Sequence, residues 1–220
     1  MTDPDFDLDP DDPERLDRAV AALLDGDLVV YPTETVYGLG ADASNPAAVD
    51  RVFDCKGRSR DKPLSLGVPD VETARRYARL TPRDERFMRA FLPGPVTVVV
   101  AADPSLPEAL TAGRDRVGLR IPDHPLALVL FRRVAPTPVT ATSANVSGSG
   151  SVRRVGELSP RVREACRVVL DGGETPGTES TVVDPERGVI HRRGANADAV
   201  EAWLADDGDG SDDTGPGSAE

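Results

Sequence analysis

Residues 54–63, DCKGRSRDKP, concentrate basic side chains that could bind phosphate groups. Lys56 and Lys62 are the only two lysines among the 26 basic residues of the chain, and Arg58 and Arg60 lie between them. An ammonium group is a compact point charge and a guanidinium is a planar fork, so together they suit a phosphate-bearing ligand. A solvated loop of mixed charge is the competing interpretation. Because the chain uses arginine everywhere else, the two lysines favour a phosphate-binding role over a solvated loop, above all at Lys56.

A second polar stretch, TATSANVSGSGS, follows an apolar strand predicted at 138–142. Its hydroxyl groups, the Asn145 amide and exposed backbone N–H groups could hold phosphate oxygens without carrying charge. The spacing fits neither a Walker A loop nor a G-x-G-x-x-G motif. A flexible Ser/Gly linker is the competing interpretation for residues 147–151, but it explains Ser143 and Asn145 poorly.

Three weaker stretches also place polar residues at the ends of predicted strands. YPTETVYGLGAD offers Thr33, Glu34 and Thr35, GTESTVVD offers Ser180, and HRRGA offers Arg192. Ligands of open α/β sheets bind beyond the carboxyl ends of strands, which gives these positions weight. For the first stretch an ordinary strand-to-helix turn is the competing interpretation.

The sequence offers little for covalent catalysis. His124 and His191 are the only histidines, and neither belongs to a recognisable Ser-His-Asp arrangement or metal-ligand cluster. The polar inventory therefore favours a site that positions and neutralises phosphates.

Short Val/Leu-rich runs alternate with helical segments, which predicts an α/β fold. We expect a twisted, mixed sheet of about seven strands flanked by helices, in one domain over residues 13–205. The expected helices include DPERLDRAVAALLDG, NPAAVDRVFDC, VETARRYARL, TPRDERFMRAFL, HPLALVLFRRV and a last helix at 197–205. The first of the expected strands is residues 28–31 and the last is residues 188–191.

The net charge of −12 lies mostly at the two ends of the chain. Residues 1–14 hold seven acidic residues and residues 206–220 hold six, both without a basic residue. Removing these 13 from the 38 acidic residues leaves 25 against 26 basic residues. We therefore expect acidic, disordered tails at 1–12 and 206–220 around a nearly neutral domain.

Cys55 and Cys166 are far apart in sequence and lack the spacing of metal ligands, so we expect reduced thiols. The acidic start does not resemble a signal peptide, and no run has the ~20 apolar residues of a membrane helix. We expect a soluble, cytoplasmic protein.

Taken together, these stretches resemble the YrdC-like family, whose members are L-threonylcarbamoyladenylate synthases. The K-x-R…S-x-N signature of that family matches Lys56-Gly57-Arg58 and Ser143-Ala144-Asn145. YPTETVYGLGAD, PGPVTVVV, TAGRDRVGLRIPDHP, TSANVSG and ESTVVD match further segments in the family's order, over about residues 15 to 205.

The resemblance implies that threonine, bicarbonate and ATP give threonylcarbamoyl-AMP and pyrophosphate, with Mg²⁺ assisting at the phosphates. A downstream transfer complex would pass the threonylcarbamoyl group to the adenosine beside the anticodon of tRNA. The implied catalytic residues are Lys56, Arg58, Ser143 and Asn145. The implied ATP contacts add Lys62, Thr111, Ser151 and Arg192, and the implied threonine contacts are Thr33, Thr35, Ala141 and Ser180.

The chain departs from the family pattern at Gly67, where some relatives carry a histidine that helps to hold threonine. It also stops soon after the catalytic region, where longer members have another domain. Two alternatives stay open: a paralogue that binds RNA without making the adenylate, and one that hydrolyses threonylcarbamoyl-AMP.

Overall fold

The computed structural model describes residues 13–209, so the tails predicted at 1–12 and beyond 209 lie outside the described residues. The helices are α1 (Pro13–Leu24), α2 (Pro46–Lys56), α3 (Val71–Ala74), α4 (Pro82–Phe91), α5 (Glu108–Thr111), α6 (Pro125–Val134), α7 (Pro160–Ala165), α8 (Ala197–Asp209) and the 3-10 helix η1 (Val155–Glu157). The strands are β1 (Leu28–Tyr31), β2 (Gly38–Gly40), β3 (Ser65–Gly67), β4 (Ala78–Arg79), β5 (Val96–Ala102), β6 (Arg116–Arg120), β7 (Val139–Ser143), β8 (Cys166–Val169), β9 (Thr181–Asp184) and β10 (Val189–Arg192).

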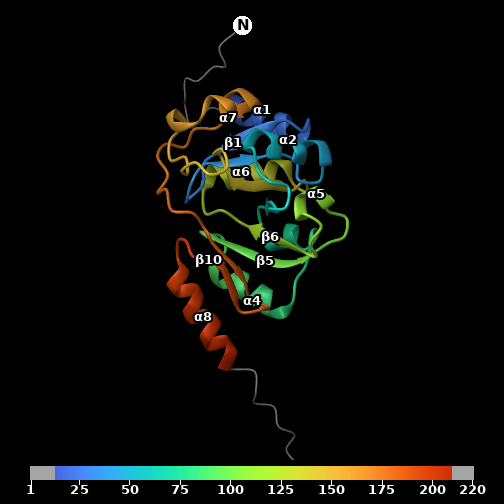
Figure 1. Ribbon diagram of the computed structural model, residues 1–220, viewed down its shortest axis with the longest axis vertical. Helices are drawn as coiled ribbons and strands as arrows, with labels where there is room; N and C mark the ends of the chain where they lie inside the picture. The colour runs from blue at the N-terminus through green and yellow to red at the C-terminus, as the bar shows by residue number, and fades with distance from the viewer. Residues whose placement is uncertain (1–12, 210–220) are drawn as a thin grey trace, which may run out of the picture.

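Within the described residues all strands join one mixed sheet, in the order β10-β9-β5-β6-β3-β7-β2-β1-β8, with β4 paired to β5. The pairs β1/β8, β3/β6 and β5/β9 are parallel, and the other pairs are antiparallel. Helices flank the sheet (Figure 1). The predicted α/β fold with a mixed sheet is confirmed, with ten strands where we expected about seven.

The extra strand β2 lies where we expected a turn. A Cβ atom on Gly38 would lie 2.5 Å from Cζ of Tyr31, and one on Gly40 would lie 2.8 Å from a methyl group of Val139. The absence of a side chain therefore lets β2 pass under the Tyr31 ring while it pairs with both β1 and β7.

The helix expected over residues 71–80 is wrong in its second half. Asp70 caps α3 through a hydrogen bond from Thr73 N, but the helix ends at Ala74. Ala78 and Arg79 instead pair with Ala102 and Ala101 of β5. Strand pairing with the sheet thus overrides a local helical pattern.

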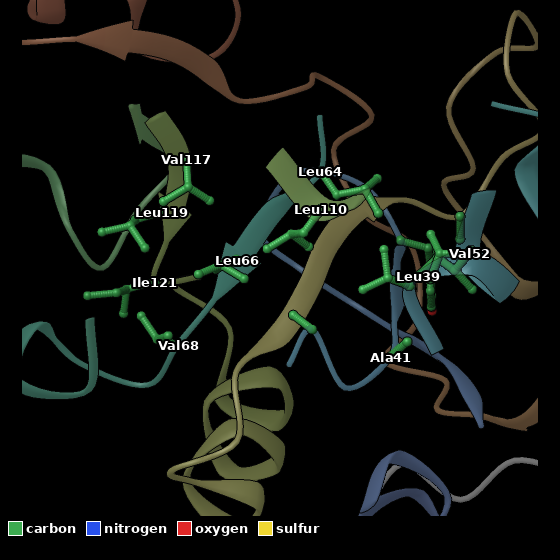
Figure 2. Packing of buried hydrophobic residues seen from close by; sticks show 14 of the residues in the cluster. Leu39, Ala41, Val52, Leu64, Leu66, Val68, Leu110, Val117, Leu119 and Ile121 are labelled. Carbon is green, nitrogen blue, oxygen red and sulfur yellow. The ribbon is translucent and has the colours of Figure 1, made fainter. Parts of the chain in front are cut away.

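Aliphatic side chains fill the core, and Figure 2 shows one part of it, which includes Leu66 of β3, Leu119 of β6, Leu64 and Leu110. A second cluster joins α1 and α6 to the sheet and contains Tyr31 and Phe131. No helix within residues 13–209 is both long enough and apolar enough to cross a membrane.

Helix α8 lies beside α4 at one end of the molecule (Figure 1). The Trp203 ring of α8 meets the Phe87 ring of α4 edge-on, with centroids 4.9 Å apart. Because α8 continues to Asp209, residues 206–209 are helical and do not belong to the disordered tail that we expected to begin at residue 206.

Candidate active site

The end of α2 places the K-x-R residues. Asn45 caps the start of the helix by accepting hydrogen bonds from Ala47 N and Ala48 N, and Pro46 fills the first helical position. Gly57 ends the helix in the left-handed region at φ 57°, where glycine is favoured. Lys56 therefore occupies the last turn of α2, and the chain reverses direction before Arg58.

Lys56 joins α2 to the end of β7. Its Nζ donates hydrogen bonds to the backbone oxygens of Ser143 and Asn145, the latter at 2.7 Å, and lies 3.4 Å from Asn145 Oδ1. The Lys56 side chain is only 2% exposed. Burial, followed by the nearby Arg58 charge, lowers the pKa of Lys56 to about 8. The ammonium group is thus a buried donor that connects the two halves of the predicted signature.

The segment after β7 forms an ordered turn. Ser143 Oγ donates to Asn145 Oδ1, and Asn145 Nδ2 donates to Ser149 O at 2.6 Å. Ser147 N donates to the backbone oxygen of Lys56 at 2.8 Å. These bonds hold the turn against α2, which is not what a flexible Ser/Gly linker would show.

Three cations approach one another at this place. Burial lowers the pKa of Arg58, and the nearby Arg192 charge lowers it further. In the same way, the Arg58 charge contributes to the lowered pKa of Lys56. Arg58 donates to the backbone oxygens of Lys62 and Pro63, which fixes its guanidinium. Glu179 compensates part of this charge through an ion pair with Arg192 at 2.8 Å. Like charges held this close favour an anionic ligand.

One cavity of about 990 Å³ opens between these elements, and most of the predicted site residues line it. On its wall lie Thr33, Lys56, Arg58, Lys62, Ala141, Ser143, Asn145, Ser180 and Arg192. His191, to which we gave no role, also lines it.

Three predicted residues do not line the cavity. Thr35 is 1% exposed and lies behind Thr33, with the two hydroxyl oxygens 2.8 Å apart. Thr111 ends α5 and donates to Glu108 O at 3.3 Å, while the following Gly113 and Arg114 reach the wall. Ser151 donates to Glu179, which itself lines the cavity, at 3.2 Å. Their roles in ligand binding stay predictions.

Arg120, at the end of β6, is a cavity residue that we missed. Its Nη2 donates to Glu34 Oε1 at 3.0 Å and to the hydroxyl oxygens of Thr33 and Thr35. Its Nε is buried and has no hydrogen-bond partner among the described residues. The missed signal is an alternation along β6, because Arg116, Gly118 and Arg120 line the cavity, whereas Val117 and Leu119 between them are core residues.

Small residues and hydroxyl groups form the floor of the cavity near Arg120. A Cβ atom on Gly118 would lie 2.5 Å from Ser65 Oγ and 2.9 Å from Thr97 Cγ2. Thr97 Oγ1 and Ser180 Oγ are 2.9 Å apart, and Arg192 Nη2 donates to Ser180 Oγ at 3.1 Å. The floor is therefore a set of fixed hydroxyl groups between Arg120 and Arg192.

Gly67 does not contribute a side chain to this floor. A Cβ atom at Gly67 would lie 2.6 Å from Cε2 of Phe131, so the phenyl ring already fills the space that a larger residue would need.

The Sua5/YciO/YrdC family model, described as telomere recombination, matches residues 21–194. The threonylcarbamoyl-AMP synthase of Pyrococcus abyssi is 39% identical over 168 residues, which are 76% of this chain and 49% of that protein. The putative threonylcarbamoyl-AMP synthase of Methanocaldococcus jannaschii is 34% identical, over 74% of this chain and 77% of that protein. The chain spans about half the length of the Pyrococcus abyssi and Bacillus subtilis relatives.

The same likeness holds in three dimensions. The crystal structure of Pyrococcus abyssi Sua5 complexed with L-threonine superposes with a TM-score of 0.77 at 37% identity, over 81% of this chain and 54% of that one. The range that the family model matches includes every residue that lines the cavity. The chain therefore belongs to the Sua5/YciO/YrdC family.

Proposed function

We propose that the chain is an L-threonylcarbamoyladenylate synthase, which makes threonylcarbamoyl-AMP and pyrophosphate from L-threonine, bicarbonate and ATP. One observation carries the proposal: Lys56, Arg58 and Arg192 line the same cavity as Arg120 and a set of hydrogen-bonded hydroxyl groups. Such a cavity suits a polyphosphate and a small amino acid bound side by side.

The triphosphate belongs on the side of the three cations. Arg58 and Arg192 present guanidinium groups for phosphate oxygens, and Ser143 and Asn145 add uncharged contacts. Lys56 holds the Ser143–Asn145 backbone in place and contributes its charge from behind it. Lys62, Thr111 and Ser151 are outer contacts in this proposal.

Threonine belongs on the side of Arg120. The guanidinium has an unpartnered buried Nε and suits the planar carboxylate of an amino acid. Thr33, Ala141 and Ser180 line the same region, and Thr35 supports it from behind. A relative in the same family was crystallised with L-threonine, which supports this assignment.

The chemistry needs alignment and charge neutralisation. The threonine amine takes up carbon dioxide to form a carbamate, and a carbamate oxygen attacks the α-phosphorus of ATP. The new P–O bond forms as the bond to the pyrophosphate leaving group breaks, and positive groups stabilise the charge on that leaving group.

Mg²⁺ enters this proposal with ATP, as part of the substrate. A metal that arrives with ATP is held chiefly by phosphate oxygens. A downstream complex that transfers the threonylcarbamoyl group to tRNA, and a cytoplasmic location, complete the proposal.

The test is pyrophosphate release by the purified protein with ATP, bicarbonate and MgCl₂, measured with and without L-threonine. We expect release that depends on both threonine and bicarbonate. Pyrophosphate release that does not depend on threonine would contradict the proposal. So would a protein that only degrades added threonylcarbamoyl-AMP.

A further inference from the structure

Glu34 is a buried carboxylate to which the proposed function gives no role. Its Oε1 accepts a hydrogen bond from Arg120 Nη2 at 3.0 Å, and the Glu34 and Arg120 side chains are only 15% and 11% exposed. Glu34 Oε2 is also buried, and it has no hydrogen-bond partner among the described residues. Arg120 lines the cavity, whereas Glu34 is not one of the described residues on its wall. Glu34 therefore acts on a ligand of the cavity through Arg120.

The turn after β1 fixes Glu34 in this position. Thr33 Oγ1 donates a hydrogen bond to Val36 O at 2.6 Å and accepts one from each of the backbone N–H groups of Thr35 and Val36 at 3.2 Å. Gly177 N donates to Thr35 O at 2.7 Å, which ties the turn to the segment that leads into β9. Such side-chain-to-backbone bonds define a turn locally. The backbone of Glu34 is thus held from both sides of the turn.

Lys56 and Arg58 line the same cavity without such a counter-charge. Among the described residues they form no ion pair, and their side chains donate to backbone oxygens and to one amide oxygen. Arg192 pairs with Glu179, but both of these side chains are partly exposed. Water and salt screen an exposed pair more strongly than a buried one. The positive charge is therefore uncompensated at Lys56 and Arg58, and it is balanced at Arg120.

We propose that Glu34 is a specificity-determining residue, which reserves the region around Arg120 for a singly charged carboxylate and keeps phosphates out of it. This inference rests on the proposed function, in which the triphosphate binds at Arg58 and Arg192 and the threonine carboxylate binds at Arg120. A polyphosphate carries several negative charges, so it binds most tightly where positive charge is uncompensated. Near Arg120 the charge of Glu34 repels a polyphosphate, while the guanidinium still offers donors to one planar carboxylate.

The negative charge of Glu34, rather than its hydrogen bond, is the property that serves this role. The amide oxygen of a glutamine would accept the same bond from Arg120. A buried charged oxygen without a partner is costly for the fold, and a glutamine would not carry that charge. Replacing Glu34 by glutamine therefore isolates the effect of the charge.

The first experiment counts bound inorganic triphosphate by equilibrium dialysis. We expect one equivalent in the wild type and a second one in Glu34→Gln, which is lost again in the double variant Glu34→Gln/Arg120→Gln. Glu34→Asp, which keeps the charge, should bind one equivalent. So should Glu174→Gln, the matched control, because Glu174 pairs with Arg153 and neither of them lines the cavity. Equal counts in the wild type and Glu34→Gln, or a second equivalent that survives the loss of Arg120, would overturn the proposal.

The second experiment measures the displacement of bound radiolabelled L-threonine by inorganic triphosphate. We expect displacement from Glu34→Gln at triphosphate concentrations about tenfold or more below those that the wild type requires, since one contact with a charged group typically changes an affinity by at least this factor. Equal displacement from the two proteins would overturn the role of Glu34.

The wild type alone decides if Glu34→Gln does not fold. A single bound triphosphate that leaves threonine in place supports the proposal, and one that displaces threonine overturns it. A wild type that binds no threonine would contradict the proposed function instead. The triphosphate count would still test Glu34 in that case, so the two failures are distinguishable.

Discussion

The ammonium group of Lys56 lies 2.7 Å from the backbone oxygen of Asn145, and this bond fastens the end of α2 to the end of β7. The two motifs that the sequence separates by more than eighty residues are therefore one structural unit. Lys56 is buried at this junction, while Arg58 and Arg192 line the same cavity with more exposed side chains. We therefore expect that lysine and arginine are not interchangeable here.

We predict that Lys56→Arg lowers threonine-dependent pyrophosphate release by about 100-fold, because a guanidinium is too large for a side chain that is 2% exposed among three oxygen acceptors. The matched control is Arg60→Lys in the same segment, whose side chain is 53% exposed, pairs with surface acids and lies over the Phe53 ring. We expect that variant to stay within about twofold of the wild type. Equal activities of the two variants would contradict the role of Lys56.

We predict that the affinity for a non-hydrolysable ATP analogue falls as the pH rises through about 8, the pKa to which burial lowers Lys56. A titration of Lys56→Met should lack this step. Stability should change in the opposite direction. The unfolded chain holds the Lys56 proton up to the ordinary lysine pKa of 10.5, so the cost of burying the charge is present below about pH 8 and is relieved as the pH rises toward 10.5. An affinity that is constant between pH 7 and 9 would refute this assignment.

We predict that Arg120→Lys raises the KM for threonine by about tenfold or more, since a single ammonium group replaces a fork that suits a carboxylate. The KM for ATP should change little, because Arg120 donates to Thr33 and Glu34, whereas we assign the triphosphate to Arg58 and Arg192. Arg133→Lys, which alters only an exposed ion pair with Asp17, is the control. If the KM values for threonine and ATP rise together, Arg120 does not belong to a threonine-binding region that is separate from the ATP-binding region.

The sequence was sufficient for those parts of the site in which unusual residue types gather. Lys56 and Arg58 were noticed by their charge density, and Ser143 and Asn145 by their place after an apolar strand. Arg120 was missed because an arginine that alternates with apolar residues on a strand can equally be a solvent-facing side chain or one that lines a cavity. Only the fold shows that this face of β6 lines a cavity.

The fold was predictable where local patterns and tertiary packing agree. Helix α2 has an Asn45 cap, a Pro46 start and a Gly57 end, and all three signals are visible in the sequence. Strand β2 consists of two glycines around Leu39, residues with no local strand signal, and depends on Tyr31 and Val139 beside it. Strand β4 likewise depends on pairing with β5 and lies inside a helical pattern.

The last prediction concerns Gly67, the position where some relatives carry histidine. We predict that Gly67→Ala lowers the free energy of unfolding by about 1–3 kcal/mol, because its methyl group would lie 2.6 Å from the Phe131 ring. Gly156→Ala is the control, since a Cβ there meets nothing within 4 Å. In urea unfolding, Phe131→Leu should remove much of the cost of Gly67→Ala, so that the double variant is more stable than the sum of the single changes implies. Two results would mean that the Phe131 ring moves aside to accommodate the methyl group. Either Gly67→Ala lowers the free energy of unfolding no more than Gly156→Ala does, or its effect is additive with that of Phe131→Leu. In that case the Phe131 ring would not be what excludes a side chain at position 67.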